Sequence, residues 1–203
     1  DVDFTLSVSA TATEAANGAT ATTTANLAVT VDAVADAPTL TVNPAAGNED
    51  TAIALSLARS LIDTDGSESL ALSVAAIPIG ATLSDGVNTF TASAGNQSVA
   101  ITTWNLAALT ITPPANSDVD FTLTVSATAT EAANGATATT VANLAVDVVP
   151  VNDAPVLGPV SLSIDPLQTV TMTGGNMSAT DVDNPAASLV FLVAGATNGQ
   201  FEL

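Results

Sequence analysis

Phe121-Thr-Leu-Thr-Val-Ser-Ala-Thr-Ala-Thr130 is the stretch that decides the fold. Every second residue from Phe121 to Ala129 is apolar, and every residue between them is Thr or Ser. A period of two predicts a β-strand with one buried face and one face in water. Ala133-Asn134-Gly135 then predicts a hairpin turn, since Asn and Gly tolerate positive φ. A return strand is expected over residues 136–149, with one face formed by Leu144, Val146 and Val148.

Shorter segments upstream follow the same pattern. Apolar residues alternate with other residues over 51–57, from Leu70 to Val74, around Val99 and Ile101, and around Leu109 and Ile111. Ser84-Asp85-Gly86 predicts a second hairpin turn, and Pro113-Pro114 interrupts the chain before the next strand. Trp104 is expected to be a packing residue. Seven or eight short strands without a helix predict an all-β immunoglobulin-like β-sandwich of Greek-key type.

The chain also contains a long internal repeat. Residues 1–38 reappear at 118–155, an offset of 117 residues, and 32 of these 38 positions are identical. Such a period fits tandem sandwich domains, and the Asp-Ala-Pro tripeptides that end each copy predict stiff joints, because Pro restricts itself and its predecessor. We therefore expect an end-to-end array. It comprises the C-terminal part of a preceding repeat (1–38), a complete repeat (39–155) and the N-terminal part of a following, divergent domain (156–203).

The composition excludes several classes of function. The 203 residues carry a net charge of -19, and Arg59 is the only base, so neither nucleic acid nor an anionic membrane surface is an expected partner. Hydrophobic residues make up 47%, which is enough to form a core. The absence of Cys argues against disulfides and zinc–thiolate sites, and no apolar run reaches transmembrane length. The chain starts in mid-pattern, with no visible signal peptide.

The acidic residues concentrate where the sandwich should have its ends. If the strands run alternately up and down, the loop 63–66 and the hairpin 131–135 lie at one end. Residues 49–50, 116–120 and the linker 152–153 lie at the other. Clustered carboxylates repel one another unless a cation neutralises them, and Ca²⁺ accommodates six to eight oxygen ligands in a tolerant geometry. The competing interpretation is that loops are simply rich in Asp and Asn.

Several motifs resemble known repeats. Val151-Asn152-Asp153-Ala154-Pro155 resembles the cadherin linker, and the two Asp-X-Asp motifs at 63–65 and 181–183 resemble the head of the following cadherin domain. The string from Trp104 to Pro114, continued by Asp118 to Val125, is more similar to the tandem repeats of large bacterial RTX adhesins. The resemblance implies tandem cadherin-like β-sandwich domains, secretion, folding in extracellular calcium and a role in attachment or biofilm formation. It implies Ca²⁺ ligands at Glu49, Asp118, Asp120, Asn152, Asp153, Asp181, Asp183, Asp1, Asp3, Asp36, Asp63, Asp65 and Glu131.

Two departures make the expected joints unequal. Ala35 stands where the linker Asn belongs at the first joint, and Leu167 and Gln168 stand where Glu49 and Asp50 would align in the third unit.

The expected function is a stalk at the cell surface, in contact with neighbouring repeats, while other domains bind a host or abiotic surface. A ligand-binding adhesin module for glycans is an alternative, disfavoured by an aromatic content of 3%. Strand donation into an extracellular filament is another. An enzyme is not expected, because only carboxylates such as Asp118 and Asp120 could supply acid–base catalysis.

Overall fold

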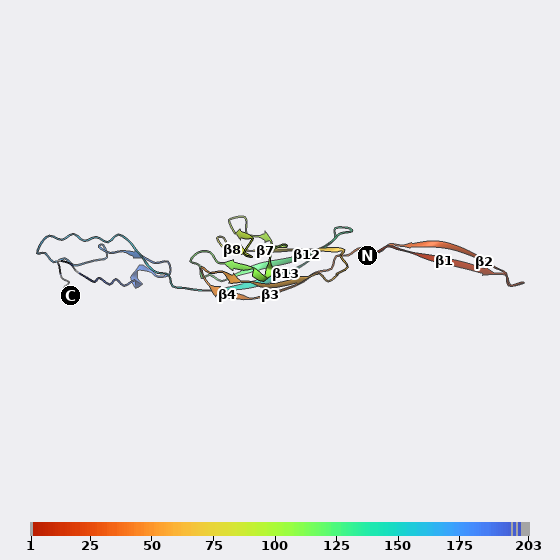
Figure 1. The fold of residues 1–203 in the computed structure, drawn as a ribbon, viewed down its shortest axis with the longest axis horizontal. Helices are drawn as coiled ribbons and strands as arrows, with labels where there is room; N and C mark the ends of the chain where they lie inside the picture. The colour runs from red at the N-terminus through yellow and green to blue at the C-terminus, as the bar shows by residue number, and fades with distance from the viewer. Residues whose placement is uncertain (1, 196, 198, 200–203) are drawn as a thin grey trace.

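A computed structural model describes residues 2–195, 197 and 199, and three bodies follow one another along its longest axis (Figure 1). The first is a hairpin of β1 (Phe4–Thr13) and β2 (Thr20–Val29). The second is a sandwich built from β3 to β13. The third contains β14 (Val156–Leu157) and β15 (Ala179–Thr180). The helical elements in the described residues are the two 3-10 turns η1 (Leu106–Ala108) and η2 (Ala186–Ser188), and no helix there is long and apolar enough to cross a membrane.

The larger sheet of the sandwich has five strands. Their order is β10 (Val99–Ala100), β7 (Glu68–Ala75), β12 (Phe121–Glu131), β13 (Thr137–Val149) and β4 (Ala45–Asn48). Neighbours are antiparallel except for β4, which runs parallel to β13. The predicted strands at 121–130 and 136–149 are confirmed. Gly135 has a φ of 71°, in agreement with the predicted turn between them.

The smaller sheet has the order β5 (Ile53–Ala54), β11 (Thr110–Thr112), β8 (Thr82–Ser84) and β9 (Thr89–Thr91), with Gly86 in the predicted turn between β8 and β9. A further pair is formed by β3 (Thr39–Asn43) and β6 (Ser56–Ser60). The single strand predicted over 51–57 is wrong in detail. The chain divides at Leu55, so that β5 pairs with β11 and β6 pairs with β3. Strands β3 and β4 were not predicted.

Alternating side chains of both sheets meet in one apolar core. The fully buried members include Leu72, Val74, Leu83, Ile101, Ile111, Leu123, Val125 and Leu144. Trp104 packs against this core as a partly buried residue, as expected. The all-β sandwich is therefore confirmed. Its expected division at residues 38 and 155 and its Greek-key, tandem arrangement stay predictions.

The hairpin β1–β2 has the same residue pairing as β12–β13, but its apolar face is exposed. Phe4 pairs with Val29 as Phe121 pairs with Val146. Leu6 is 47% exposed, whereas its copy Leu123 is 0% exposed. The same sequence thus forms the same ladder in both places, and residues 39–117 supply the second layer only to the second copy.

Candidate cation sites at the two joints

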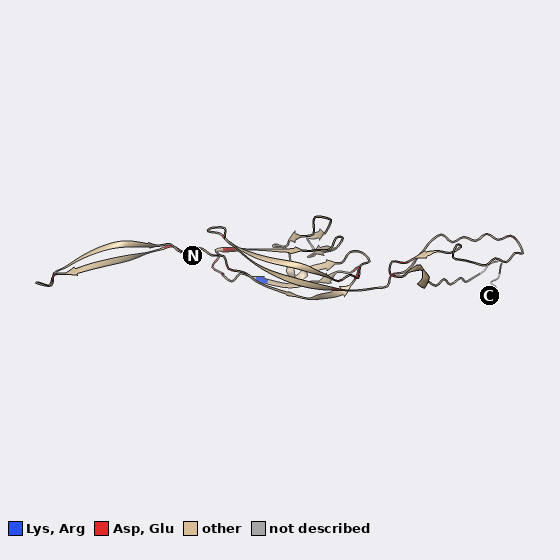
Figure 2. Ribbon diagram, turned by 180° about the vertical axis from the view of Figure 1, so that it is seen from behind, with Lys and Arg blue, Asp and Glu red and all other residues tan. Residues whose placement is uncertain are grey.

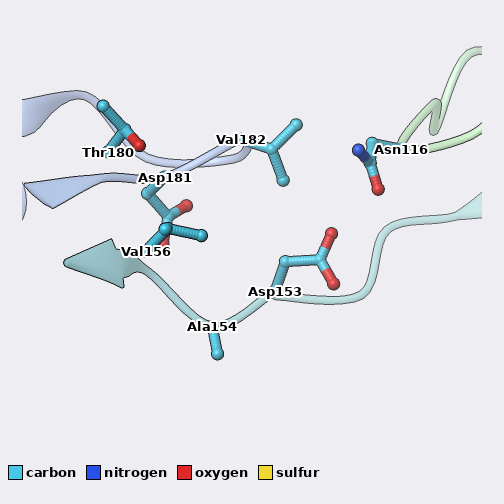
Figure 3. A pocket seen from close by; sticks show the side chains of 7 residues that line it. All are labelled: Asn116, Asp153, Ala154, Val156, Thr180, Asp181 and Val182. Carbon is cyan, nitrogen blue, oxygen red and sulfur yellow. The ribbon is translucent and has the colours of Figure 1, made fainter. Parts of the chain in front are cut away.

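Oxygen-bearing side chains from three parts of the chain meet where the sandwich is followed by residue 156. One hollow of about 450 Å³ is lined by Glu49, Asn116, Asp118, Pro150, Val151, Asn152, Asp183 and Asn184. A neighbouring hollow of about 430 Å³ is lined by Asn116, Asp153, Ala154, Val156, Thr180, Asp181 and Val182 (Figure 3). The structure therefore brings together six of the residues proposed as ligands from the sequence: Glu49, Asp118, Asn152, Asp153, Asp181 and Asp183.

Hydrogen bonds connect the two sides of this second joint. The backbone N–H of Asp153 donates to Asp183 Oδ2 at 2.6 Å. The side-chain amide of Asn184 donates to Asn152 Oδ1 at 2.9 Å. Asn184 lies directly after the Asp-X-Asp motif, and the sequence patterns did not single it out. Direct hydrogen bonds thus hold the linker against the start of the following segment, independently of a bound ion.

Asn116 links the two hollows through its side-chain amide. In the orientation that satisfies its hydrogen bonds, the NH₂ group donates to Asp153 Oδ2 at 3.2 Å and to Asp50 Oδ2 at 3.3 Å. Asn116 therefore connects the sandwich to the linker directly.

The first joint gathers a different set of acids. Asp63 Oδ1 accepts the N–H of Asp65 at 3.0 Å, and Asp65 Oδ1 accepts the N–H of Ser67 at 2.8 Å. The backbone hydrogen bond from Ser67 is the largest cause of the lowered pKa of Asp65. The backbone N–H of Ala132 donates to the Ser67 carbonyl at 2.9 Å, so the loop and the hairpin turn lie together at one end, as expected.

The linker at this joint is held by a residue that the sequence patterns did not select. Glu68 Oε1 accepts the backbone N–H of Asp36 at 2.7 Å. Asp36 and Asp153 are the same position in the two repeat copies, so Glu68 binds at the first joint the N–H that Asp183 binds at the second.

Asp3 and Asp120 have a different environment. Asp3 Oδ1 accepts the N–H of Val31 at 2.9 Å, and Asp120 Oδ1 accepts the N–H of Val148 at 2.8 Å. Each carboxylate thereby fixes the far end of its own hairpin, and neither lines the hollows described above. The predicted ligand Asp1 lies outside the described residues.

Three acidic side chains are buried in the part of the chain that the structure describes, and one of these three is well supplied with donors. Asp85 is 5% exposed and accepts hydrogen bonds from Val87, Asn88 and Asn105, which hold its pKa well below the usual range, with Asn88 the largest cause. Its role is to fix the turn between β8 and β9. Glu49 and Glu131 are 3% and 1% exposed.

Glu49 accepts one hydrogen bond, from the Val151 N–H at 2.8 Å, and Glu131 accepts one, from the Ala133 N–H at 3.2 Å. Burying a carboxylate is costly without a partner of opposite charge or several donors. These two glutamates therefore lack the compensation that Asp85 has.

The donor set fits calcium. The available ligands are carboxylate, amide, hydroxyl and backbone oxygens, the hard donors that Ca²⁺ prefers, and no Cys or His is present to favour zinc. Among residues 2–195, 197 and 199, no three acidic side chains are gathered closely enough to hold a metal ion by themselves. A bound Ca²⁺ would need amide, backbone and water oxygens as further ligands, or a small closure of the joint.

No protein-family model matches this sequence, and a comparison with curated proteins found no match. The resemblance to RTX adhesin repeats therefore stays an expectation.

Proposed function

We propose that this chain is part of the repetitive stalk of a bacterial cell-surface adhesin, in which Ca²⁺ bound at the joints stiffens a row of β-sandwich domains. The observation that carries the proposal is the second joint. Carboxylates from the sandwich, the linker and the following segment line two adjoining hollows there. An ion bound by all three would fix their relative orientation.

Electrostatics gives the joint its dependence on the ion. The chain has a net charge of -19, and Figure 2 shows acidic residues near the ends of the sandwich. Without a cation, facing carboxylates repel across the joint. Two unit charges 4 Å apart interact by roughly 4 kcal/mol at the effective dielectric constant near a protein surface. With Ca²⁺ bound between them, the interaction would become attractive. The same residues would therefore push the bodies apart without the ion and connect them with it.

A stalk also agrees with the shape and the repetition. The three bodies lie in a row (Figure 1), and a repeated 38-residue segment recurs with 32 identical positions. Near-identical repetition adds length without adding a new binding surface. Extracellular fluid supplies calcium at millimolar concentration, so the proposed location is outside the cell. Attachment and biofilm formation would then depend on other domains that the stalk presents.

The test measures stability and length with and without calcium. An ion with a Kd of about 10⁻⁴ M, in the range of extracellular calcium modules, stabilises by about 1.8 kcal/mol at roughly 2 mM Ca²⁺. We expect a higher melting temperature and a narrower distribution of lengths in small-angle X-ray scattering with Ca²⁺ than with EGTA. The double variant D153N/D183N should lose most of the length response. D147N, on an exposed position of β13, is the matched control.

Two results would contradict the proposal. One is a chain whose melting temperature and scattering curve are the same in Ca²⁺ and in EGTA. The other is a D153N/D183N variant that responds to calcium as fully as D147N does.

A further inference from the structure

Two glutamates continue the apolar stripe of the larger sheet at the first joint. Glu68 begins the core-facing series of β7 that proceeds through Leu70, Leu72 and Val74. Glu131 ends the core-facing series of β12, after Ala127 and Ala129. The side chains of both glutamates therefore point to the inside of the sandwich, where an apolar residue would follow the pattern.

These glutamates also face one another. Glu131 and Glu68 are directly paired in the antiparallel ladder, so their Cβ atoms lie about 5 Å apart on the same face. Directly opposed like charges destabilise a sheet, and here Glu131 is only 1% exposed. Arg59, the only base in the chain, donates to the Thr102 carbonyl and forms no ion pair with either of these described glutamates.

The hydrogen bonds made by the two carboxylates leave some of their oxygens without a donor. Glu131 Oε1 accepts the Ala133 N–H and Glu68 Oε1 accepts the Asp36 N–H. Glu68 Oε2 is buried without a hydrogen-bond partner, and so is the neighbouring Ser67 hydroxyl. Within the described residues, an almost fully buried carboxylate and a second carboxylate with a buried free oxygen thus share one rung of the sheet, and an unpartnered hydroxyl lies next to it in the sequence.

We propose that Glu68 and Glu131 together bind a hard divalent cation at this end of the sandwich, and that Glu68 connects the ion to the linker. One oxygen of Glu68 holds the Asp36 N–H, and the other is free to bind the ion. Ser67 and water supply further oxygens. Ion binding would thereby fix the direction in which the linker leaves the sandwich. This inference rests on the proposed calcium-dependent function and adds a ligand to it.

The repeat provides a matched control. Glu14 is the copy of Glu131, and both glutamates make the same backbone turn. The backbone carbonyl of Glu14 accepts from the Gly18 N–H, and its backbone N–H donates to the Ala19 carbonyl. The backbone of Glu131 makes the same two hydrogen bonds with Gly135 and Ala136. Glu14 is exposed, and among the described strands β1 pairs with β2 alone, which places no carboxylate opposite Glu14. Glu14→Gln therefore changes the same residue in nearly the same sequence without touching the proposed site.

The experiment titrates CaCl₂ into the 203-residue chain by isothermal calorimetry and records melting in EGTA and in Ca²⁺. Glu68→Gln and Glu131→Gln should each weaken one class of ion binding at least 10-fold. In EGTA both variants should melt above the wild-type chain, because the opposed charges are gone. In Ca²⁺ they should melt below it. Glu14→Gln should match the wild-type chain in both buffers.

A merely structural role for Glu68 predicts a different pattern. Glu68→Gln would then lower the melting temperature equally in both buffers and leave the calcium titration unchanged, and either result would overturn the inference. If the wild-type chain binds calcium and Glu68→Gln binds it equally well, the inference fails and the proposed function stands. If the wild-type chain binds no calcium, both fail.

Discussion

Leu123→Ala and Leu6→Ala make the same substitution in two copies of one sequence. Leu123 is 0% exposed in β12 and pairs with Leu144, whereas Leu6 is 47% exposed in β1 and pairs with Leu27. Large-to-small substitution in a core costs about 2.7–5 kcal/mol, because it loses buried area and leaves a cavity. A surface substitution usually stays within about 0.5 kcal/mol. The structure therefore predicts very different costs.

These free energies translate into melting temperatures. An entropy of unfolding of about 2.1 cal/mol/K per residue gives about 0.25 kcal/mol/K for a unit of 117 residues, so 1 kcal/mol corresponds to about 4 °C. Leu123→Ala should lower the midpoint by about 11–20 °C, and Leu6→Ala should lower it by no more than about 2 °C. Circular dichroism near 218 nm is the appropriate signal for both variants, because it follows the strands of both bodies, and the fluorescence of Trp104 identifies the transition of the sandwich, against whose core this sole Trp packs.

Equal shifts in the two variants would refute the reasoning, since they would mean that β1–β2 is covered as fully as β12–β13 in the same chain. A shift below about 4 °C for Leu123→Ala would refute it in another way, by showing that this position does not lie in a close-packed core. Circular dichroism near 218 nm, recorded on the same samples, checks that both variants keep the strand content of the parent chain.

Three further predictions test other parts of the structure. Gly47→Ala should destabilise the sandwich by about 1–3 kcal/mol in urea unfolding, because the added Cβ would lie 2.8 Å from Ile53 Cγ1; Gly174→Ala, with nothing within 4 Å, should have no effect. Asp85→Ala should destabilise the fold more than Asp147→Ala. Because the folded-state pKa of Asp85 is lowered, this difference should be full above about pH 4 and shrink as the pH falls below it in acid-unfolding curves. Raising NaCl from about 0.05 to 0.5 M in EGTA should raise the melting temperature by screening carboxylate repulsion, and a smaller rise is expected in Ca²⁺.

The sequence predicted those strands whose burial alternates strictly. In β12 the apolar side chains lie on one face and the Thr and Ser side chains on the other, without exception up to Thr130. The strand, its buried face and the turn after it could therefore all be predicted. Strand β4 could not be found in this way, because Ala45 to Asn48 contains small residues and Gly with weak strand preference. Its pairing comes from β13, a strand about 100 residues later, which no local pattern reveals.

The second joint was largely predictable because its residues lie in loops. Asp and Asn in turns are conspicuous in a sequence, and six of the proposed ligands do meet there. Asn116 and Asp50 were expected at this end of the sandwich but were not proposed as ligands, although both lie within two residues of a proposed ligand. Glu68 was missed for a different reason. It lies inside a strand, where a charged residue is ordinarily taken to face water.

Strand parity would have identified Glu68. Counting back in twos from Val74 through Leu72 and Leu70 reaches Glu68, which places this carboxylate on the buried face. The same count from Leu123 reaches Glu131, so two acids fall on the core side of adjacent strands at one end of a sheet. Glu14 continues the same parity directly after β1 and is exposed, because none of the described residues packs over that hairpin. An acidic residue in a strand is therefore a candidate ligand when parity turns it inward and a second layer covers it, and only the second of these conditions requires the tertiary structure.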